Sequence, residues 1–306
     1  MTKIVVFQSE TFTGEQKNRL DELGSVDWYE GVPASGEDYL AKVVGADVIL
    51  SSTSGLRESY PALKDVFVAV PFVGVGFVDL DVLRSNNVTL SNAPGVNRHA
   101  VSEWVICMII LLLRDLYPAI NRVETYRKDA VTMPPLTRSL ADAKVTILGA
   151  GNVGQQVAKL LKPFEAEVEF FNKDDDLLKS VSGADIVVNS LSSNPTTLGL
   201  LNKEFFANMK KGSYFVSITA EDIIDDDALI AALDSGQLAG AAIDFGNTVL
   251  VGDTENPVYV RMMKHPKILA TPHIAYSAEK SILVGNDVAI DNIEAWLDGR
   301  PQNVVT

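Results

Sequence analysis

Short runs of Val, Ile, Phe and Leu recur along the chain between segments in which apolar residues have helical spacing. Most of these runs are continuously apolar and do not alternate with polar residues, which is typical of strands buried on both faces of a parallel sheet. Their alternation with helical segments predicts a doubly wound α/β fold. The predicted strands are Ile4–Phe7, Val26–Tyr29, Val48–Leu50, Val66–Val70, Val145–Leu148, Val168–Phe171, Ile186–Val188, Tyr214–Ile218, Ala241–Phe245 and Ile268–Ala270.

The predicted strands fall into two groups, one before about residue 90 and one after about residue 144. Between the groups lie a long apolar helix, predicted over Ala100–Leu116, and a polar stretch that contains Met133-Pro134-Pro135. The chain has 306 residues, which is enough for two domains at roughly 100 to 200 residues each. We therefore predict two α/β domains, with a last helix over Ser281–Leu297 that returns to the first.

The charge balance of the chain is acidic. A total of 26 Lys and Arg against 40 Asp and Glu gives a formal net charge of −14. Such a surface repels phosphate backbones and anionic lipid headgroups, so the composition argues against nucleic acid and membrane surfaces as partners. The expected partner is a small molecule.

Cysteine content and apolar stretches limit the protein class further. Cys107 is the only cysteine, which excludes an internal disulfide and a multi-cysteine metal site and favours a cytoplasmic location. The N-terminal run Ile4–Phe7 is too short for a signal peptide. The longest apolar stretch, Trp104–Leu113, is about half of the ~20 residues that a membrane span needs. We interpret it as a buried helix in which Cys107 is inert.

A glycine motif with the spacing Gly-x-Gly-x-x-Gly follows the predicted strand Val145–Leu148 and opens a helical pattern over Gln155–Leu161. In this context the first glycine permits a tight turn, the second lets a pyrophosphate approach the backbone, and the third allows close helix packing. The helix N-terminus offers amides to phosphate. The residues expected to bind a dinucleotide here are Gly149, Gly151, Asn152, Val153 and Gly154.

The end of the next strand bears on the choice between NAD and NADP. An NAD site usually carries an acid there, about 20 residues after the glycines, which accepts from the ribose 2′-hydroxyl. Here the position is Asn172, followed by Lys173, and this pair repels a 2′-phosphate less than a carboxylate would. Asp174-Asp175-Asp176 argue in the other direction. Both cofactors stay open, as does the alternative that residues 172–176 form a solvated turn without ribose contact.

Several further segments, taken with the glycine motif, resemble the D-2-hydroxy acid dehydrogenase family over nearly the whole chain. They are Gly74–Asp81, Asn92–Gly95 leading into Val101–Glu103, Pro195–Asn202, Asp244 and Thr271–Ala275. The resemblance implies a Rossmann-like cofactor domain, residues 96–275, inserted into a flavodoxin-like substrate domain, residues 1–95 and 276–306. It also implies a nicotinamide at the cleft, Asp244 among the cofactor-binding residues, and a homodimer through the long helix.

The family's catalytic groups are only partly matched. In the family a histidine acts as acid and base, a glutamate hydrogen-bonds it, and an arginine holds the carboxylate and carbonyl of the substrate. His273 matches the histidine, but Ala220 stands at the arginine position. Val249, or Leu250 if one residue is inserted before Pro257, stands at the glutamate position, and neither is an acid. Losing a bidentate guanidinium costs about 2 to 5 kcal/mol, or roughly 30- to several-thousand-fold. Simple 2-oxo acids are therefore expected to be poor substrates, although an imidazole still exchanges protons near neutral pH.

Other candidates for the substrate site lie outside the cofactor motif. Ser52 and Thr53 follow a predicted strand and either bind a ligand or cap the next helix. Val75 and Gly76 belong to the glycine segment of the substrate domain. Arg98, just before the long helix, is either a replacement anion clamp or a solvated cation.

The sequence thus predicts an NAD- or NADP-dependent oxidoreductase with an altered substrate site. Hydride would move between the nicotinamide and a carbonyl carbon, and His273 would carry the proton. The alternative is a dinucleotide-binding dimer without dehydrogenase activity, acting as a redox sensor or scaffold. No metal is expected.

Overall fold

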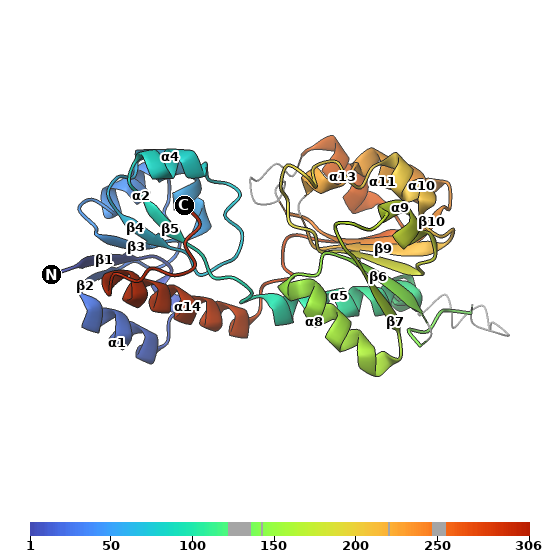
Figure 1. Ribbon diagram of the computed structural model, residues 1–306, viewed down its shortest axis with the longest axis horizontal. Coiled ribbons are helices and arrows are strands. Elements are labelled where there is room, and N and C mark those ends of the chain that lie inside the picture. The colour runs from blue at the N-terminus through green and yellow to red at the C-terminus, as the bar shows by residue number, and fades with distance from the viewer. Residues whose placement is uncertain (122–135, 142, 220, 247–254) are drawn as a thin grey trace. The chain divides into compact units, whose positions relative to one another are not determined.

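The computed structural model describes residues 1–121, 136–141, 143–219, 221–246 and 255–306. The described chain divides into two compact units: unit 1 comprises Met1–Asn97 and Ser277–Thr306, and unit 2 comprises Arg98–Tyr276. The chain leaves unit 1, completes unit 2 and then returns, as the blue and red ends within one unit of Figure 1 illustrate. These limits lie one or two residues beyond residues 95 and 275.

Unit 1 is built on a five-stranded sheet with the order β2-β1-β3-β4-β5, parallel throughout. This order is that of flavodoxin-like sheets. The strands are β1 (Lys3–Val6), β2 (Ser25–Trp28), β3 (Val48–Leu50), β4 (Phe67–Ala69) and β5 (Thr89–Ser91). The helices are η1 (Ser9–Thr11), α1 (Gly14–Leu23), α2 (Gly36–Lys42), α3 (Thr53–Ser59), η2 (Tyr60–Ala62), α4 (Leu80–Ser85) and α14 (Glu279–Leu297).

Both faces of this sheet are buried, which explains the continuously apolar strands. Ile4 and Val6 of β1 pack with Leu20 of α1 and Ile290 of α14 on one face. The intervening Val5 packs on the opposite face in a cluster with residues of α2, α3 and α4. Successive side chains of a strand point to opposite faces, so the central strands β1, β3 and β4 are apolar at nearly every position, whereas the edge strands β2 and β5 include polar residues.

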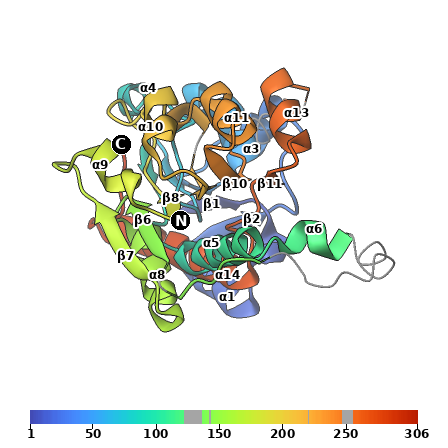
Figure 2. The same cartoon turned by 90° about the vertical axis from the view of Figure 1, so that its right-hand side faces the viewer.

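Unit 2 contains a six-stranded sheet with the order β11-β10-β9-β8-β6-β7, also parallel. Its strands are β6 (Lys144–Leu148), β7 (Glu167–Phe171), β8 (Ile186–Asn189), β9 (Ser213–Ser217), β10 (Leu238–Asp244) and β11 (Ile268–Thr271). Its helices are α5 (Arg98–Leu113), α6 (Leu116–Asn121), α8 (Asn152–Leu161), η3 (Lys162–Phe164), α9 (Leu177–Ser182), α10 (Lys203–Asn208), η4 (Glu221–Ile223), α11 (Asp226–Asp234) and α13 (Pro257–Lys264). Helices α5 and α8 cover one face, and α9, α10, α11 and α13 cover the other (Figures 1 and 2). The predicted fold class, two doubly wound parallel-sheet domains, is confirmed.

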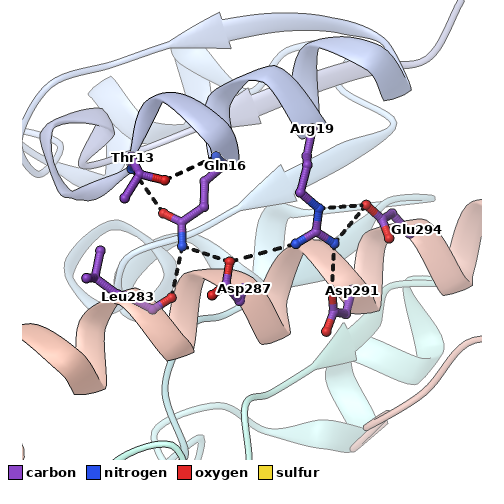
Figure 3. Close-up of polar contacts among 7 residues, drawn as sticks. All are labelled: Thr13, Gln16, Arg19, Leu283, Asp287, Asp291 and Glu294. Atoms are coloured by element: carbon purple, nitrogen blue, oxygen red, sulfur yellow. Dashed lines mark hydrogen bonds and ion pairs between the residues drawn. The ribbon is translucent and has the colours of Figure 1, made fainter.

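Polar contacts fasten α14 to α1 beneath the sheet of unit 1 (Figure 3). Thr13 and Gln16 form a capping box at the start of α1. The Gln16 side chain also donates from Nε2 to the Leu283 carbonyl oxygen at 3.0 Å and to Asp287 Oδ1 at 2.9 Å. Gln16 therefore both caps the start of α1 and holds α14 against it.

Arg19, one turn further along α1, contacts three carboxylates on one side of α14 (Figure 3). Its guanidinium nitrogens lie 3.7 Å from Asp287, 2.7 Å from Asp291 and 2.9 Å from Glu294. These acids stand four and three residues apart, so they share one face of the helix. A network of this kind holds its partners more firmly than one isolated surface pair.

The structure corrects the prediction for Cys107. The buried residues of α5 lie on one face of the helix only, and the Cys107 side chain is exposed. The continuous apolar sequence of α5 suggested burial all round, but its outward face is not covered within unit 2. Within the described residues, no helix is long and apolar enough to cross a membrane.

Candidate functional site

Polar and glycine-rich segments follow the strands of unit 2 at one edge of the sheet. Because all six strands are parallel, their carboxyl ends meet at that edge, where ligands bind in open α/β sheets. The direction of chain progress reverses between β6 and β8, and the glycine motif follows β6. Ser190, directly after β8, donates from Oγ to the carbonyl oxygens of Leu148 at 2.9 Å and Gly149 at 3.0 Å. The glycine loop is thus tied to the neighbouring strand end at the crossover point.

The three glycines of the motif stand in different surroundings. Gly149 has φ of +100°, and a Cβ there would lie 2.9 Å from the Ser190 carbonyl oxygen. A Cβ on Gly154 would lie 2.1 Å from the Gly149 carbonyl oxygen. Gly151 has an ordinary φ of −76°, and a Cβ there would meet no atom within 4 Å. The fold itself requires the outer two glycines, whereas the space above Gly151 is open to a ligand.

The first turn of α8 suits an anion. Gly151 is its N-cap residue, provides no side-chain cap, and no acidic side chain stands in the first turn. Asn152 is exposed and Val153 half-buried. The first amides of a helix have no partner within the helix and carry partial positive charge. The residues present therefore fit the pyrophosphate of a dinucleotide.

The end of β7 carries a carboxylate beside the expected ribose position. The Asn172 backbone N and side-chain Nδ2 both donate to Asp175 Oδ2, at 2.8 and 3.1 Å. Asp176 caps α9 by accepting from Leu178 N and Lys179 N. Lys173 is exposed. The Asp175 carboxylate thus stands within hydrogen-bond distance of the residue that occupies the family's acid position.

Asp244, at the end of β10, is buried and holds the turn after β11. Its Oδ1 accepts from Thr271 Oγ1 at 2.5 Å and from Ile274 N at 3.0 Å. Its Oδ2 accepts from Ala275 N at 2.9 Å. Within this turn, His273 has φ of +56°, a left-handed conformation that costs energy for any residue except glycine. The three bonds to Asp244 offset that cost.

The His273 ring is oriented by a main-chain oxygen. Its Nδ1 lies 3.1 Å from the Phe245 carbonyl oxygen. Because a carbonyl can only accept, Nδ1 carries the proton, and in the neutral ring Nε2 keeps the lone pair. The half-buried ring also lies 5.3 Å from the Tyr276 ring, measured between centroids. The Phe245 carbonyl thus engages Nδ1 and leaves the Nε2 lone pair for a different partner.

Neutral side chains join the ends of β8 and β9. The buried Asn189 donates from Nδ2 to Ser217 Oγ at 3.1 Å and to Thr219 Oγ1 at 2.7 Å. Ala220 and Val249, the residues at the family's arginine and glutamate positions, lie outside the described residues. Two acidic residues, Glu221 and Asp222, follow Ala220 in the sequence. The Asp222 carboxylate accepts from Ser193 Oγ at 2.6 Å.

The substrate candidates of unit 1 follow two neighbouring strands. Ser52 and Thr53 begin α3 after β3, and Val75 and Gly76 follow β4. Ser52 is the N-cap residue of α3, but its side chain makes no capping hydrogen bond. Among the described residues its buried Oγ has no hydrogen-bond partner. Gly76 is exposed, and a Cβ there would meet no atom within 4 Å.

Arg98, the remaining candidate, is the first residue of α5 and is exposed. No sequence signal pointed to Ser190 or to the Phe245 carbonyl, because serine is a common residue type and a main-chain carbonyl has no residue code. Asp175 belongs to the acidic run that favoured NAD, but its contact with Asn172 depends on the folded turn. Among the described residues, no group of three His, Cys, Asp or Glu side chains is arranged to hold a metal ion.

Comparisons with known proteins agree with this architecture. Residues 106–275 match the family model described as "D-isomer specific 2-hydroxyacid dehydrogenase, NAD binding domain". D-lactate dehydrogenase of Treponema pallidum (strain Nichols) is 29% identical over 303 residues, covering 90% of each chain. The corresponding enzyme of Staphylococcus aureus (strain Mu50) is 25% identical over 307 residues, covering 92% of each.

Solved structures resemble the chain over its full length. The crystal structure of a Treponema pallidum D-lactate dehydrogenase has a TM-score of 0.79 at 24% identity, covering 100% of both chains. That of a D-2-hydroxyisocaproate dehydrogenase has a TM-score of 0.80 at 21% identity, again covering 100% of both. At these identities the likeness concerns the fold. The match of the family model, over more than half of the chain, shows that the protein belongs to the D-isomer specific 2-hydroxyacid dehydrogenase family of NAD-dependent oxidoreductases.

Proposed function

We propose that the protein transfers hydride between NAD and a small carbonyl or hydroxy compound, with His273 as the acid and base. The observation that supports this most directly is the His273 turn, in which Asp244 fixes the backbone and the Phe245 carbonyl orients the ring. This turn stands at the same sheet edge as the glycine motif. Gly149, Gly151, Asn152, Val153 and Gly154 would hold the pyrophosphate, with the remaining contacts to Asn172, Lys173 and Asp244.

The chemistry assigned to the protein side chains is proton transfer. NADH, when bound, supplies the hydride to the carbonyl carbon. Protonated His273 gives its Nε2 proton to the carbonyl oxygen, which becomes the hydroxyl, while Nδ1–H stays on the Phe245 carbonyl. That acceptor is uncharged, so the pair lacks the attraction between opposite charges that a carboxylate would add. Oxidation of the hydroxy compound runs the same steps in reverse.

The proposed substrate is less dependent on a carboxylate than the usual substrates of the family. Ala220 cannot supply a guanidinium, and the two residues that follow it in sequence, Glu221 and Asp222, are acids that would repel a carboxylate. A 2-oxo acid would then rely on Arg98 or on the Ser52–Thr53 and Val75–Gly76 segments. The alternative function, a dinucleotide-binding redox sensor or scaffold without turnover, rests on the residues Ala220 and Val249. The cytoplasmic location stays a prediction.

The pyrophosphate assignment predicts that Gly151→Val abolishes NADH binding. A valine side chain would fill the open space above the loop, and we expect at least a ~100-fold loss of affinity in titration calorimetry. Gly183→Val is the matched control, since a Cβ at Gly183 also meets no atom within 4 Å. The control should bind NADH like the parent. Undiminished binding by Gly151→Val would refute the assignment.

The position of Asp175 predicts that NAD is preferred to NADP. A carboxylate beside Asn172 accepts from a 2′-hydroxyl and repels a 2′-phosphate. Asp175→Asn should shift the ratio of NADH to NADPH affinity toward NADPH by about 1 to 2 kcal/mol, roughly 5- to 30-fold. Fluorescence titration with both cofactors measures this ratio, with Asp174→Asn as the control. An unchanged ratio would mean that residues 172–176 do not contact the ribose.

The acid and base role predicts that His273→Gln lowers kcat by about 10²- to 10⁴-fold while NADH affinity is kept. The assay is steady-state NADH oxidation with a panel of 2-oxo acids and neutral carbonyl compounds. His265→Gln is the control, because this second imidazole pairs with the exposed Asp234. If the parent binds NADH tightly but reduces none of the panel, and His273→Gln changes nothing, the non-catalytic alternative is favoured.

A homodimer through α5 is also proposed. Trp104, Cys107, Met108 and Leu111 line the outward face of this helix, and none of them is fully buried in the single chain. An uncovered apolar face of this kind marks an association surface. Leu111→Arg should convert a dimer into a monomer by light scattering, with Phe164→Arg on the surface of unit 2 as the control. A parent that is already monomeric at micromolar concentration would contradict the proposal.

A further inference from the structure

Three asparagines join segments of unit 1 that are far apart in sequence. Asn92 directly follows β5, Asn292 lies in α14, and Asn303 lies in the C-terminal tail. Asn303 Nδ2 donates to Asn292 Oδ1 at 2.8 Å, and Asn292 Nδ2 donates to the Asn92 carbonyl oxygen at 2.9 Å. The Asn92 backbone N donates in turn to the Asn303 carbonyl oxygen at 3.1 Å. The three residues close a ring of hydrogen bonds, and Asn292 at its centre is fully buried.

The side chain of Asn92 reaches from this ring to the loop after β4. Its Nδ2 donates to the Val73 carbonyl oxygen at 2.7 Å. The preceding carbonyl, that of Phe72, accepts from Ala93 N at 3.0 Å. The carbonyl before that, on Pro71, lies so close to α14 that a Cβ on Gly285 would approach it to 2.2 Å. Two successive carbonyls, those of Phe72 and Val73, are therefore held by hydrogen bonds from outside the loop, and the Pro71 carbonyl packs closely against α14.

The elements that hold the loop are themselves firmly held. Helix α14 is fastened to α1 through Gln16 and Arg19 (Figure 3). The tail pairs with β5 through an antiparallel bridge between Ser91 and Val304, and Val305 N donates to the Leu90 carbonyl oxygen at 2.9 Å. The loop thus takes its position from the last part of the chain.

We propose that Asn92 is a positioning residue that holds loop 71–76 in the conformation that receives the substrate. This inference rests on the proposed function and assigns to its Val75–Gly76 segment the contact with the substrate. Asn92 itself need not touch the ligand. Its Nδ2 fixes Val73, two residues before Val75, so loss of this one donor frees the segment that leads into the contact residues.

The test compares Asn92→Ala with Asn92→Asp and with Asn86→Ala. Asp keeps the size of the side chain but cannot donate to a carbonyl. Asn86→Ala is the matched control, because Asn86 Nδ2 also donates to a loop carbonyl of unit 1, that of Pro61, at 2.9 Å. Both Asn92 variants should raise KM for the best carbonyl substrate of the panel about tenfold. They should leave kcat within about threefold and NADH affinity unchanged, and the control should match the parent.

Hydrogen exchange provides a readout that does not depend on turnover. The amides of residues 73–76 should exchange faster in both Asn92 variants and not in Asn86→Ala. Unchanged exchange would overturn the positioning role. Faster exchange with unchanged KM in an active enzyme would overturn the link to the substrate while the proposed function stands. A parent that reduces no carbonyl compound would instead refute the proposed function, and the substrate role of Asn92 with it.

Discussion

The parallel direction of all six strands in unit 2 is the constraint on which its candidate site depends. Parallel strands bring every carboxyl end to one edge, so Gly149, Asn172, Asp244 and His273 share that edge although they span more than a hundred residues of sequence. The crossover at β6 and β8 requires a close approach between two loops, which Gly149 and Gly154 permit and Ser190 fastens. Of the three glycines in the motif, only Gly151 is not required by packing, and the space above it is open to a ligand.

The Asp244 carboxylate of the candidate site is engaged in hydrogen bonds within the protein. Both oxygens of Asp244 accept bonds from the His273 turn, and the ring has a carbonyl for its partner in place of a carboxylate. The Asn189, Ser217 and Thr219 cluster is neutral. In the described residues the His273 ring is thus oriented by hydrogen-bond geometry, through the Phe245 carbonyl and the turn that Asp244 holds. The proposed proton transfer requires this fixed orientation.

The sequence predicted what depends on residue type and spacing. Continuous apolar runs marked the strands, and the glycine spacing marked the crossover loop. Strand β5 (Thr89–Ser91) was missed because two of its three residues are polar, and Ser91 is buried there all the same. Cys107 was wrongly predicted to be buried, because a helix that is apolar on every face gives no indication of which face stays exposed. The Phe245 carbonyl and the Asn92 contact depend on tertiary placement, which no local pattern encodes.

The return of the chain links the two halves of the fold. The core cluster of unit 1 that contains Ile4 and Leu20 also contains Ala289, Ile290 and Ile293 of α14. Loop 71–76 is held by Asn92 and Ala93, and Asn292 of α14 donates in turn to the Asn92 carbonyl oxygen. The core of unit 1 and the position of loop 71–76 therefore depend on residues that follow the whole of unit 2 in the sequence. Closing so long a segment costs only slightly more entropy than closing a short one, because the cost grows with the logarithm of length. The contacts of Arg19 and Gln16 with α14 help to offset this entropy cost.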